Sequence, residues 1–140
     1  MTPAAPSLVS HVRARHGPSL PAALERLVTP FGGWPAIISP GERVAVKVTL
    51  LRGAPPERAV CTHPETLRWV LRALRAAGAE PFVADSPGGL NGPAKIARAY
   101  HVSGIAGVCG DEGVPIVDIE DAKTSVASPQ GRLYRAFTIG

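Results

Sequence analysis

The sequence predicts an α/β protein: a three-layer-like βαβαβ unit with a small, mainly parallel sheet. Two observations predict this class. Apolar runs rich in β-branched residues recur along the chain, and segments with helical periodicity separate them. Strands that alternate with helices are typical of parallel sheets whose crossover helices lie against the sheet. Because three parallel strands make a thin sheet, we expect an incomplete domain, the N-terminal portion of a larger one.

The first 18 residues show no regular apolar period. We therefore expect a flexible arm over residues 1–18 and a single α/β domain over residues 19–140. Four apolar residues then recur at the spacing of a short helix: Leu20, Leu24, Leu27 and Val28. Pro30 and the two glycines that follow it end this helix.

Four apolar segments predict strands. Residues 43–51 form a nearly continuous apolar run, which predicts a strand buried on both faces. The other three strands are predicted over residues 81–84, 114–119 and 132–139.

Three segments between the strands predict helices. The clearest covers residues 63–77, where leucines and Val70 form one stripe, arginines form another, and Gly78 follows as a left-handed C-terminal cap. Two further helices are predicted over residues 93–101 and 104–112.

Composition excludes several classes of protein. The chain of 140 residues is 45% hydrophobic and 19% charged, as expected of a globular domain. Its net charge of +4 comes from scattered arginines, and only 5% of residues are aromatic, so we expect no nucleic-acid partner. No apolar stretch approaches a membrane span, so we expect no membrane partner and a cytoplasmic location. The two isolated cysteines build neither a zinc site nor an iron–sulfur cluster by themselves.

Polar side chains gather at the carboxyl ends of the predicted strands, where parallel sheets bind ligands. The candidates for catalysis are Lys47, His63 and Asp85. The candidates for ligand binding are Thr49, Thr62, Ser86, Gly88 and Gly89. His63 and Asp85 are also candidate metal ligands. The sequence predicts a small-molecule or metal ligand, and leaves open whether the protein is an enzyme.

Each candidate also has a purely structural interpretation. Thr62 and Glu65 have the spacing of a capping box that starts the helix. Asp85 and Ser86 are also typical of a turn. Lys47 interrupts an apolar strand, so we expect it to reach the sheet edge or to pair with a carboxylate, with Asp85 as the natural partner. The glycines match neither the dinucleotide fingerprint nor a P-loop.

Several segments together resemble the family called domain of unknown function 362. They are residues 31–33 (FGG), 40–51 (PGERVAVKVTLL), 60–64 (VCTHP), 76–79 (AAGA), 84–88 (ADSPG) and 93–119. The resemblance implies a link to redox chemistry, because many members carry ferredoxin-type modules with [4Fe–4S] clusters. This chain lacks the cysteines of such a module, and Val48 and Thr49 replace the family's Pro-Asn pair.

Two functions follow as hypotheses. In the first, the strand ends bind a small anionic ligand or a metal, with a possible redox link. In the second, the chain is a non-catalytic interaction module whose open sheet edge pairs with a missing C-terminal half or with a second copy of the chain.

Overall fold

The computed structural model describes residues 7–15, 17–85, 87, 92–117, 124–127 and 136–139. The helices in these ranges are α1 (Leu20–Val28), α2 (Trp34–Ile37), α3 (Pro64–Ala76), α4 (Pro93–Val102) and α5 (Ile105–Glu112), with short 3-10 helices η1 (Thr29–Phe31) and η2 (Pro56–Arg58). The strands are β1 (Arg43–Lys47), β2 (Glu80–Ala84), β3 (Thr124–Ala127) and β4 (Ala136–Ile139). The predicted α/β class with a small parallel sheet is confirmed.

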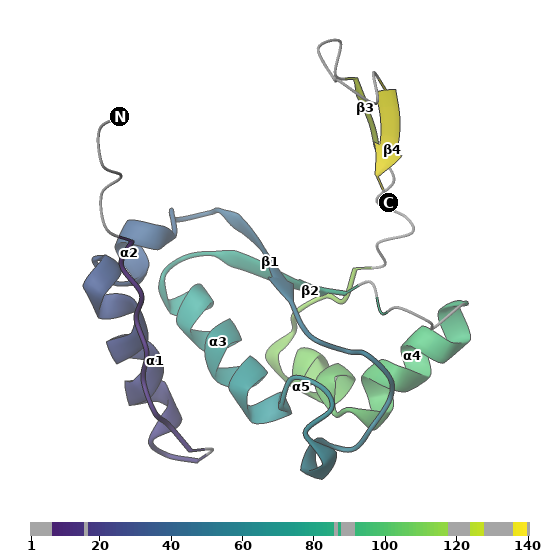
Figure 1. The fold of residues 1–140 in the computed structure, drawn as a ribbon, viewed down its shortest axis with the longest axis horizontal. Helices are drawn as coiled ribbons and strands as arrows, with labels where there is room; N and C mark the ends of the chain where they lie inside the picture. Colours follow the sequence, from purple (N-terminus) through teal and green to yellow (C-terminus); the bar gives the residue numbers. More distant parts are fainter. Residues whose placement is uncertain are drawn as a thin grey trace.

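β1 and β2 are neighbouring parallel strands that α3 connects (Figure 1). Arg43 lies opposite Glu80 and Lys47 lies opposite Ala84. The sequence predicts this unit well, because an apolar run, an amphipathic helix and a second apolar run follow one another with glycine and proline between them.

The third predicted strand is reduced to a single parallel bridge between Val83 and Ile116. The Val83 N–H donates to the Pro115 carbonyl (2.9 Å), and the Val117 N–H donates to the Val83 carbonyl (2.8 Å). β2 is therefore flanked by β1 on one side and by this segment on the other. The rest of the predicted strand, from residue 118, lies outside the described residues.

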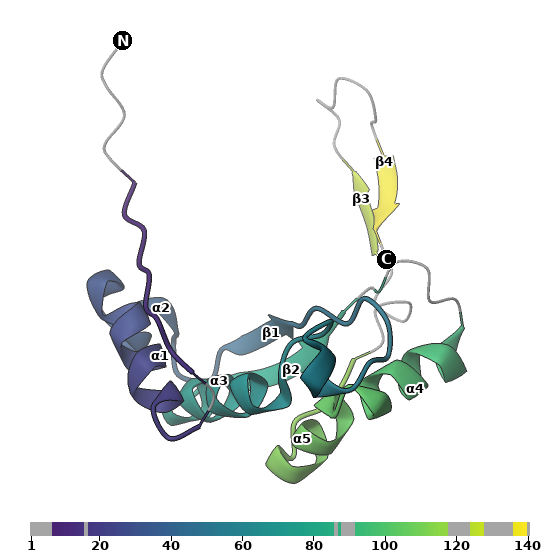
Figure 2. The same cartoon turned by 60° about the horizontal axis from the view of Figure 1, so that its bottom comes forward.

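β1 is shorter than predicted, and only one of its faces is buried. Val44 and Val46 are partly buried, whereas Arg43, Ala45 and Lys47 are exposed. Both views place α3, α4 and α5 on the same side of the β1–β2 pair (Figures 1 and 2). The prediction of a strand buried on both faces is therefore wrong. The small Ala45 makes the apolar run look continuous although its position alternates with the buried valines.

The core lies between the sheet and α3, α4 and α5. The α3 stripe supplies Leu67 and Leu71, which pack with Val83 of β2 and with Ile105 and Val108 of α5. Burial of each such leucine contributes about 1.5–3 kcal/mol to folding. α3 ends as predicted, since Gly78 has a φ of 89°, which is in the left-handed region.

The turn between α4 and α5 lies against the start of α3. Gly104 has a φ of 76°, and a Cβ placed on it would lie 2.9 Å from Cγ of Pro64. Both constraints require glycine at this position.

The C-terminal strands form a separate antiparallel pair, in which Thr124 lies opposite Ile139. The strand predicted over residues 132–139 is observed as β4, and its first four residues lie outside the described ranges. β3 is not predicted, because its four residues, TSVA, lack an apolar run. Within the described ranges, no helix has the length and apolar character needed to cross a lipid bilayer.

The arginine stripe of α3 holds the C-terminal end of α5. Arg68 donates to Glu112 and to Asp111, each at 2.7 Å, and the Nε of Arg72 donates to Glu112 at 3.0 Å. Arg75 donates to the main-chain carbonyls of Glu112 and Gly113. These arginines therefore act within the fold.

Charge on Glu112 should contribute to stability in a pH-dependent way. Hydrogen bonds from Arg72 chiefly, with a further contribution from Arg68, lower the pKa of Glu112 below 4.5 despite the opposing effect of burial. A lowered carboxyl pKa gives stability that is present above the unfolded-state pKa and is lost as the pH falls through the folded-state pKa. We expect Glu112→Gln to cost about 1 kcal/mol of unfolding free energy at neutral pH. Urea unfolding at neutral and acidic pH measures the free energy of unfolding. The difference in this free energy between the parent and Glu112→Gln should become smaller as the pH is lowered.

Asp111→Asn is the matched control, because the Asp111 side chain is 63% exposed and that of Glu112 only 11%. We expect Asp111→Asn to lower the free energy of unfolding by a smaller amount, and this amount should depend less on pH. Equal losses for the two variants would contradict the role given to Glu112.

Candidate functional site

Asp85 follows β2 directly, and its carboxylate joins β2 to the loop after β1. Oδ2 accepts a hydrogen bond from the Leu50 N–H at 2.8 Å, and Oδ1 lies 2.9 Å from Nζ of Lys47. The Asp85 side chain is only 4% exposed. The two residues meet because parallel neighbouring strands end at the same edge of the sheet. The carboxylate thus satisfies a buried backbone donor and an ammonium at once.

Lys47 ends β1 on the exposed face of the sheet. Its side chain is 74% exposed, and Nζ also donates to the Val48 carbonyl at 3.2 Å. An ammonium group has three N–H donors. Asp85 and Val48 use two of them, and none of the hydrogen bonds found among the described residues uses the third.

The loop after β1 is bonded to the segment that precedes α3. The Thr49 N–H donates to Oγ1 of Thr62, and the Thr62 N–H donates to the Thr49 carbonyl, both at 2.9 Å. Sγ of Cys61 donates to the carbonyls of Leu50 (3.1 Å) and Arg52 (3.0 Å). The loop that carries the Leu50 N–H is therefore held on two sides, by Asp85 and by residues 61–62.

The predicted capping box is not formed, because Thr62 bonds to Thr49 instead. His63 is the N-cap of α3, and its Nδ1 accepts from the Glu65 N–H at 3.2 Å. The Glu65 carboxylate accepts from the Gly17 N–H at 2.8 Å. His63 therefore has a structural part to play at the start of the helix. Its predicted roles in catalysis and in metal binding stay predictions.

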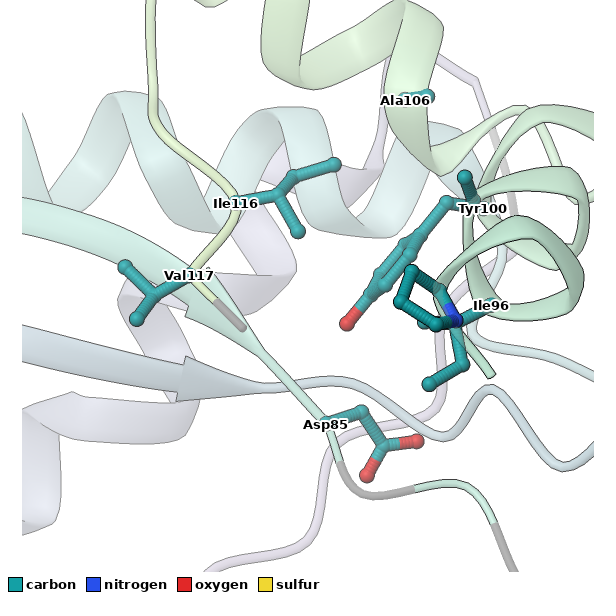
Figure 3. Close-up of a pocket in the computed structure, with 8 residues that line it drawn as sticks. Asp85, Ile96, Tyr100, Ala106, Ile116 and Val117 are labelled. Carbon is teal, nitrogen blue, oxygen red and sulfur yellow. The ribbon is translucent and has the colours of Figure 1, made fainter. Parts of the chain in front are cut away.

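A pocket of about 340 Å³ opens beside Asp85 (Figure 3). It is lined by Asp85, by Pro93, Ile96, Ala97 and Tyr100 of α4, by Ala106 of α5, and by Ile116 and Val117. We call it the strand-end pocket. Its lining is mainly apolar, with a carboxylate and a phenol as polar groups, which is the usual make-up of small-molecule sites.

Sequence reasoning missed the α4 side of this pocket. Its four residues recur at positions 93, 96, 97 and 100, a spacing that places them on one side of a helix. That spacing is a usable signal, but these residues are largely apolar, whereas the candidates predicted from the sequence are chiefly polar side chains and glycines. The candidates Ser86, Gly88 and Gly89 lie outside the described residues.

The two cysteines do not fit a ferredoxin-type iron–sulfur cluster, which needs four thiolate ligands. Cys61 donates to two backbone carbonyls, and burial raises the pKa of the Cys109 thiol, which is part of the core. Among the residues described, no three His, Cys, Asp or Glu side chains gather as a metal site. Metal binding by His63 and Asp85 stays a prediction.

Comparisons with known proteins point to one family. The model of the family "domain of unknown function" (DUF362) matches residues 44–140. The chain is also similar to the thylakoid-associated protein sll1697 of Synechocystis sp. (strain ATCC 27184 / PCC 6803 / Kazusa), with 42% identity over 69 residues. That alignment covers 49% of this chain and 22% of the relative. No solved structure matches the chain.

Removal of the Asp85 side chain should destabilise the fold, because the buried Leu50 N–H loses its acceptor. We expect Asp85→Ala to cost about 1–3 kcal/mol of unfolding free energy. Asp85→Asn keeps an acceptor and should recover part of this loss. Lys47→Met removes only an exposed partner and should cost less than about 1 kcal/mol. Urea unfolding at neutral pH orders the three variants, and an Asp85→Ala protein as stable as the parent would contradict this anchoring role.

Proposed function

This chain belongs to the family domain of unknown function 362, and we propose that its strand-end pocket binds a small molecule with an apolar body and one anionic group. The supporting observation is that Asp85 lines a mainly apolar pocket and forms an ion pair with Lys47, which lies next to the lining. The chain spans 22% of the length of its curated relative, so the proposal concerns this part of a family member alone.

The apolar body would lie against α4. Ile96 and Tyr100 project into the pocket from this helix, opposite Ile116 (Figure 3). Transfer of apolar surface from water into such a pocket contributes about 25 cal/mol per Å². A volume of about 340 Å³ suits a ligand with one ring or a short chain.

The anionic group would meet Lys47. Nζ lies one hydrogen bond from the pocket wall, since its partner Asp85 lines the pocket. A ligand whose anionic group extends past Asp85, beyond the lining, would accept a charge-assisted hydrogen bond from the remaining N–H of this ammonium. Asp85 holds Lys47 in place while its own charge is balanced.

The hypothesis drawn from the sequence also included His63 and a redox link, and neither is required for binding in the strand-end pocket. His63 would act as a proton carrier or metal ligand only if the bound molecule reaches the start of α3. The redox link rests on the resemblance to family members with ferredoxin-type modules, and the cysteines of this chain supply no part of it.

Phenylacetate and its neutral analogue phenylacetamide test the proposal by calorimetric titration. We expect phenylacetate to bind about five-fold more tightly, because a charge-assisted contact adds about 1 kcal/mol. Lys47→Gln should remove this preference while leaving the binding of the amide unchanged. Equal binding of the two compounds by the parent protein would refute the anionic part of the proposal.

Filling the pocket with a large side chain provides a second test of the same proposal. Ala97 is exposed at the rim and lines the pocket, so Ala97→Trp should block both compounds without disturbing the core. Ala94→Trp, on the same helix but outside the lining, is the matched control. Undiminished binding by Ala97→Trp would place the compounds elsewhere.

A second candidate function is association of two copies through β1. The Val48 N–H donates to the Ala84 carbonyl, and the Glu42 carbonyl accepts from the Glu80 N–H, so alternate residues of β1 bond to β2. The backbone groups of Ala45 and Lys47 therefore face the outer edge. In the part of the chain that the structure describes, no strand pairs with that edge. Such edges pair readily with strands of other chains.

The outer edge can be blocked without breaking the ladder to β2. Ala45→Pro removes an outward N–H and disfavours strand addition. We expect the parent chain to form concentration-dependent dimers in sedimentation experiments and Ala45→Pro to stay monomeric. A parent chain that is monomeric at every concentration would exclude this candidate.

A further inference from the structure

A second pocket, of about 320 Å³, lies between α4 and the loop after β1. Six residues line it: Arg52, Gly53, Lys95, Arg98, Ala99 and Val102. We call it the basic pocket. None of its residues lines the strand-end pocket, so it is a separate feature of the surface.

α4 has a pocket on each of two opposite sides. Successive helical residues turn by about 100°. Positions 93, 96, 97 and 100 therefore fall on one side and positions 95, 98, 99 and 102 on the other. The first set is mainly apolar, whereas the second presents Lys95 and Arg98 above Ala99 and Val102.

The loop brings a third cation to this side of the helix. Gly53 lies so close to α4 that an added Cβ would be 2.9 Å from Cα of Ala99. The loop is fixed on either side of Leu51, because the Arg52 carbonyl accepts from Cys61 and the Leu50 N–H donates to Asp85. Arg52 is therefore held beside α4 by its backbone.

The three cations of the basic pocket differ from the other clustered arginines of the chain. Arg68 and Arg72 form ion pairs with α5, whereas Arg52, Lys95 and Arg98 are exposed and enter none of the ion pairs found among the described residues. No carboxylate is among the six lining residues. Their charges repel one another across a pocket of this size, which is comparable with the screening length of about 8 Å at physiological salt.

We propose that the basic pocket binds a small anion with at least two negative charges, of the phosphate-ester or pyrophosphate class. Two guanidinium groups offer paired N–H donors that match phosphate oxygens, and Lys95 adds a point charge. Ala99 and Val102 supply an apolar floor for the organic part of the ligand. The pocket involves one helix and one short loop, so it suits a small molecule better than a polymer.

Isothermal titration with sodium pyrophosphate in a low-salt buffer tests this proposal on the full chain. We expect saturable binding of one pyrophosphate per chain, and about ten-fold weaker binding by Arg98→Gln, since the loss of one charge-assisted contact has about that effect. Arg26→Gln is the matched control, because Arg26 is exposed on α1 and its loss changes the net charge equally. It should bind as the parent does.

Lys47→Gln separates this site from the strand-end pocket and should also leave pyrophosphate binding unchanged. Three results would overturn the proposal: no saturable binding by the parent, equal weakening by Arg26→Gln and Arg98→Gln, or weakening by Lys47→Gln with no effect of Arg98→Gln. A stable Arg98→Gln protein is expected, because this side chain makes no ion pair in the described part of the fold.

Discussion

The buried carboxylate of Asp85 is the contact on which this edge of the molecule depends. It accepts the Leu50 N–H and pairs with Lys47, so one side chain joins the ends of both parallel strands. A buried N–H without an acceptor is costly, and the loop after β1 has few other ways to satisfy one. The positions of Lys47, of the Thr49–Thr62 pair and of Arg52 follow from this anchor, because all of them lie on or next to the same loop. The two pockets beside α4 thus share one structural support.

The Lys47–Asp85 pair lies at the end of a sheet that helices cover on one face. Parallel sheets are normally covered on both faces, whereas here α3, α4 and α5 lie on one side only among the described residues (Figure 2). The exposed face carries Lys47, whose ammonium stays hydrated while its partner is buried. The cost of burying the Asp85 carboxylate is offset by the Leu50 N–H and by this ammonium. The outer backbone groups of β1 are accessible for a different reason, since no strand among the described residues pairs with that edge.

The sequence predicted the elements that depend on local pattern and missed those that depend on partners. The amphipathic stripe of α3 and the glycine after it were sufficient to predict that helix and its end. The pairing of Lys47 with Asp85 was also predicted, although its premise of a lysine in a buried strand does not hold, because the Lys47 side chain is 74% exposed. In contrast, Thr62 and Glu65 have the spacing of a capping box, yet both side chains bond to distant residues, Thr49 and Gly17. Short β3 gave no local signal, since only its pairing with β4 makes it a strand.

The contact between Gly104 and Pro64 has a mechanical consequence. Gly104 ends the turn that follows α4, and Pro64 is the first residue of α3, immediately after His63. The Gly104 backbone lies so close to the Pro64 ring that an added Cβ would be 2.9 Å from Cγ of Pro64. A shift of the C-terminal end of α4 toward α3 is therefore blocked by the first residue of α3. A molecule that pushes this end of α4 toward α3 would therefore act on Pro64 and on the adjacent N-cap, His63.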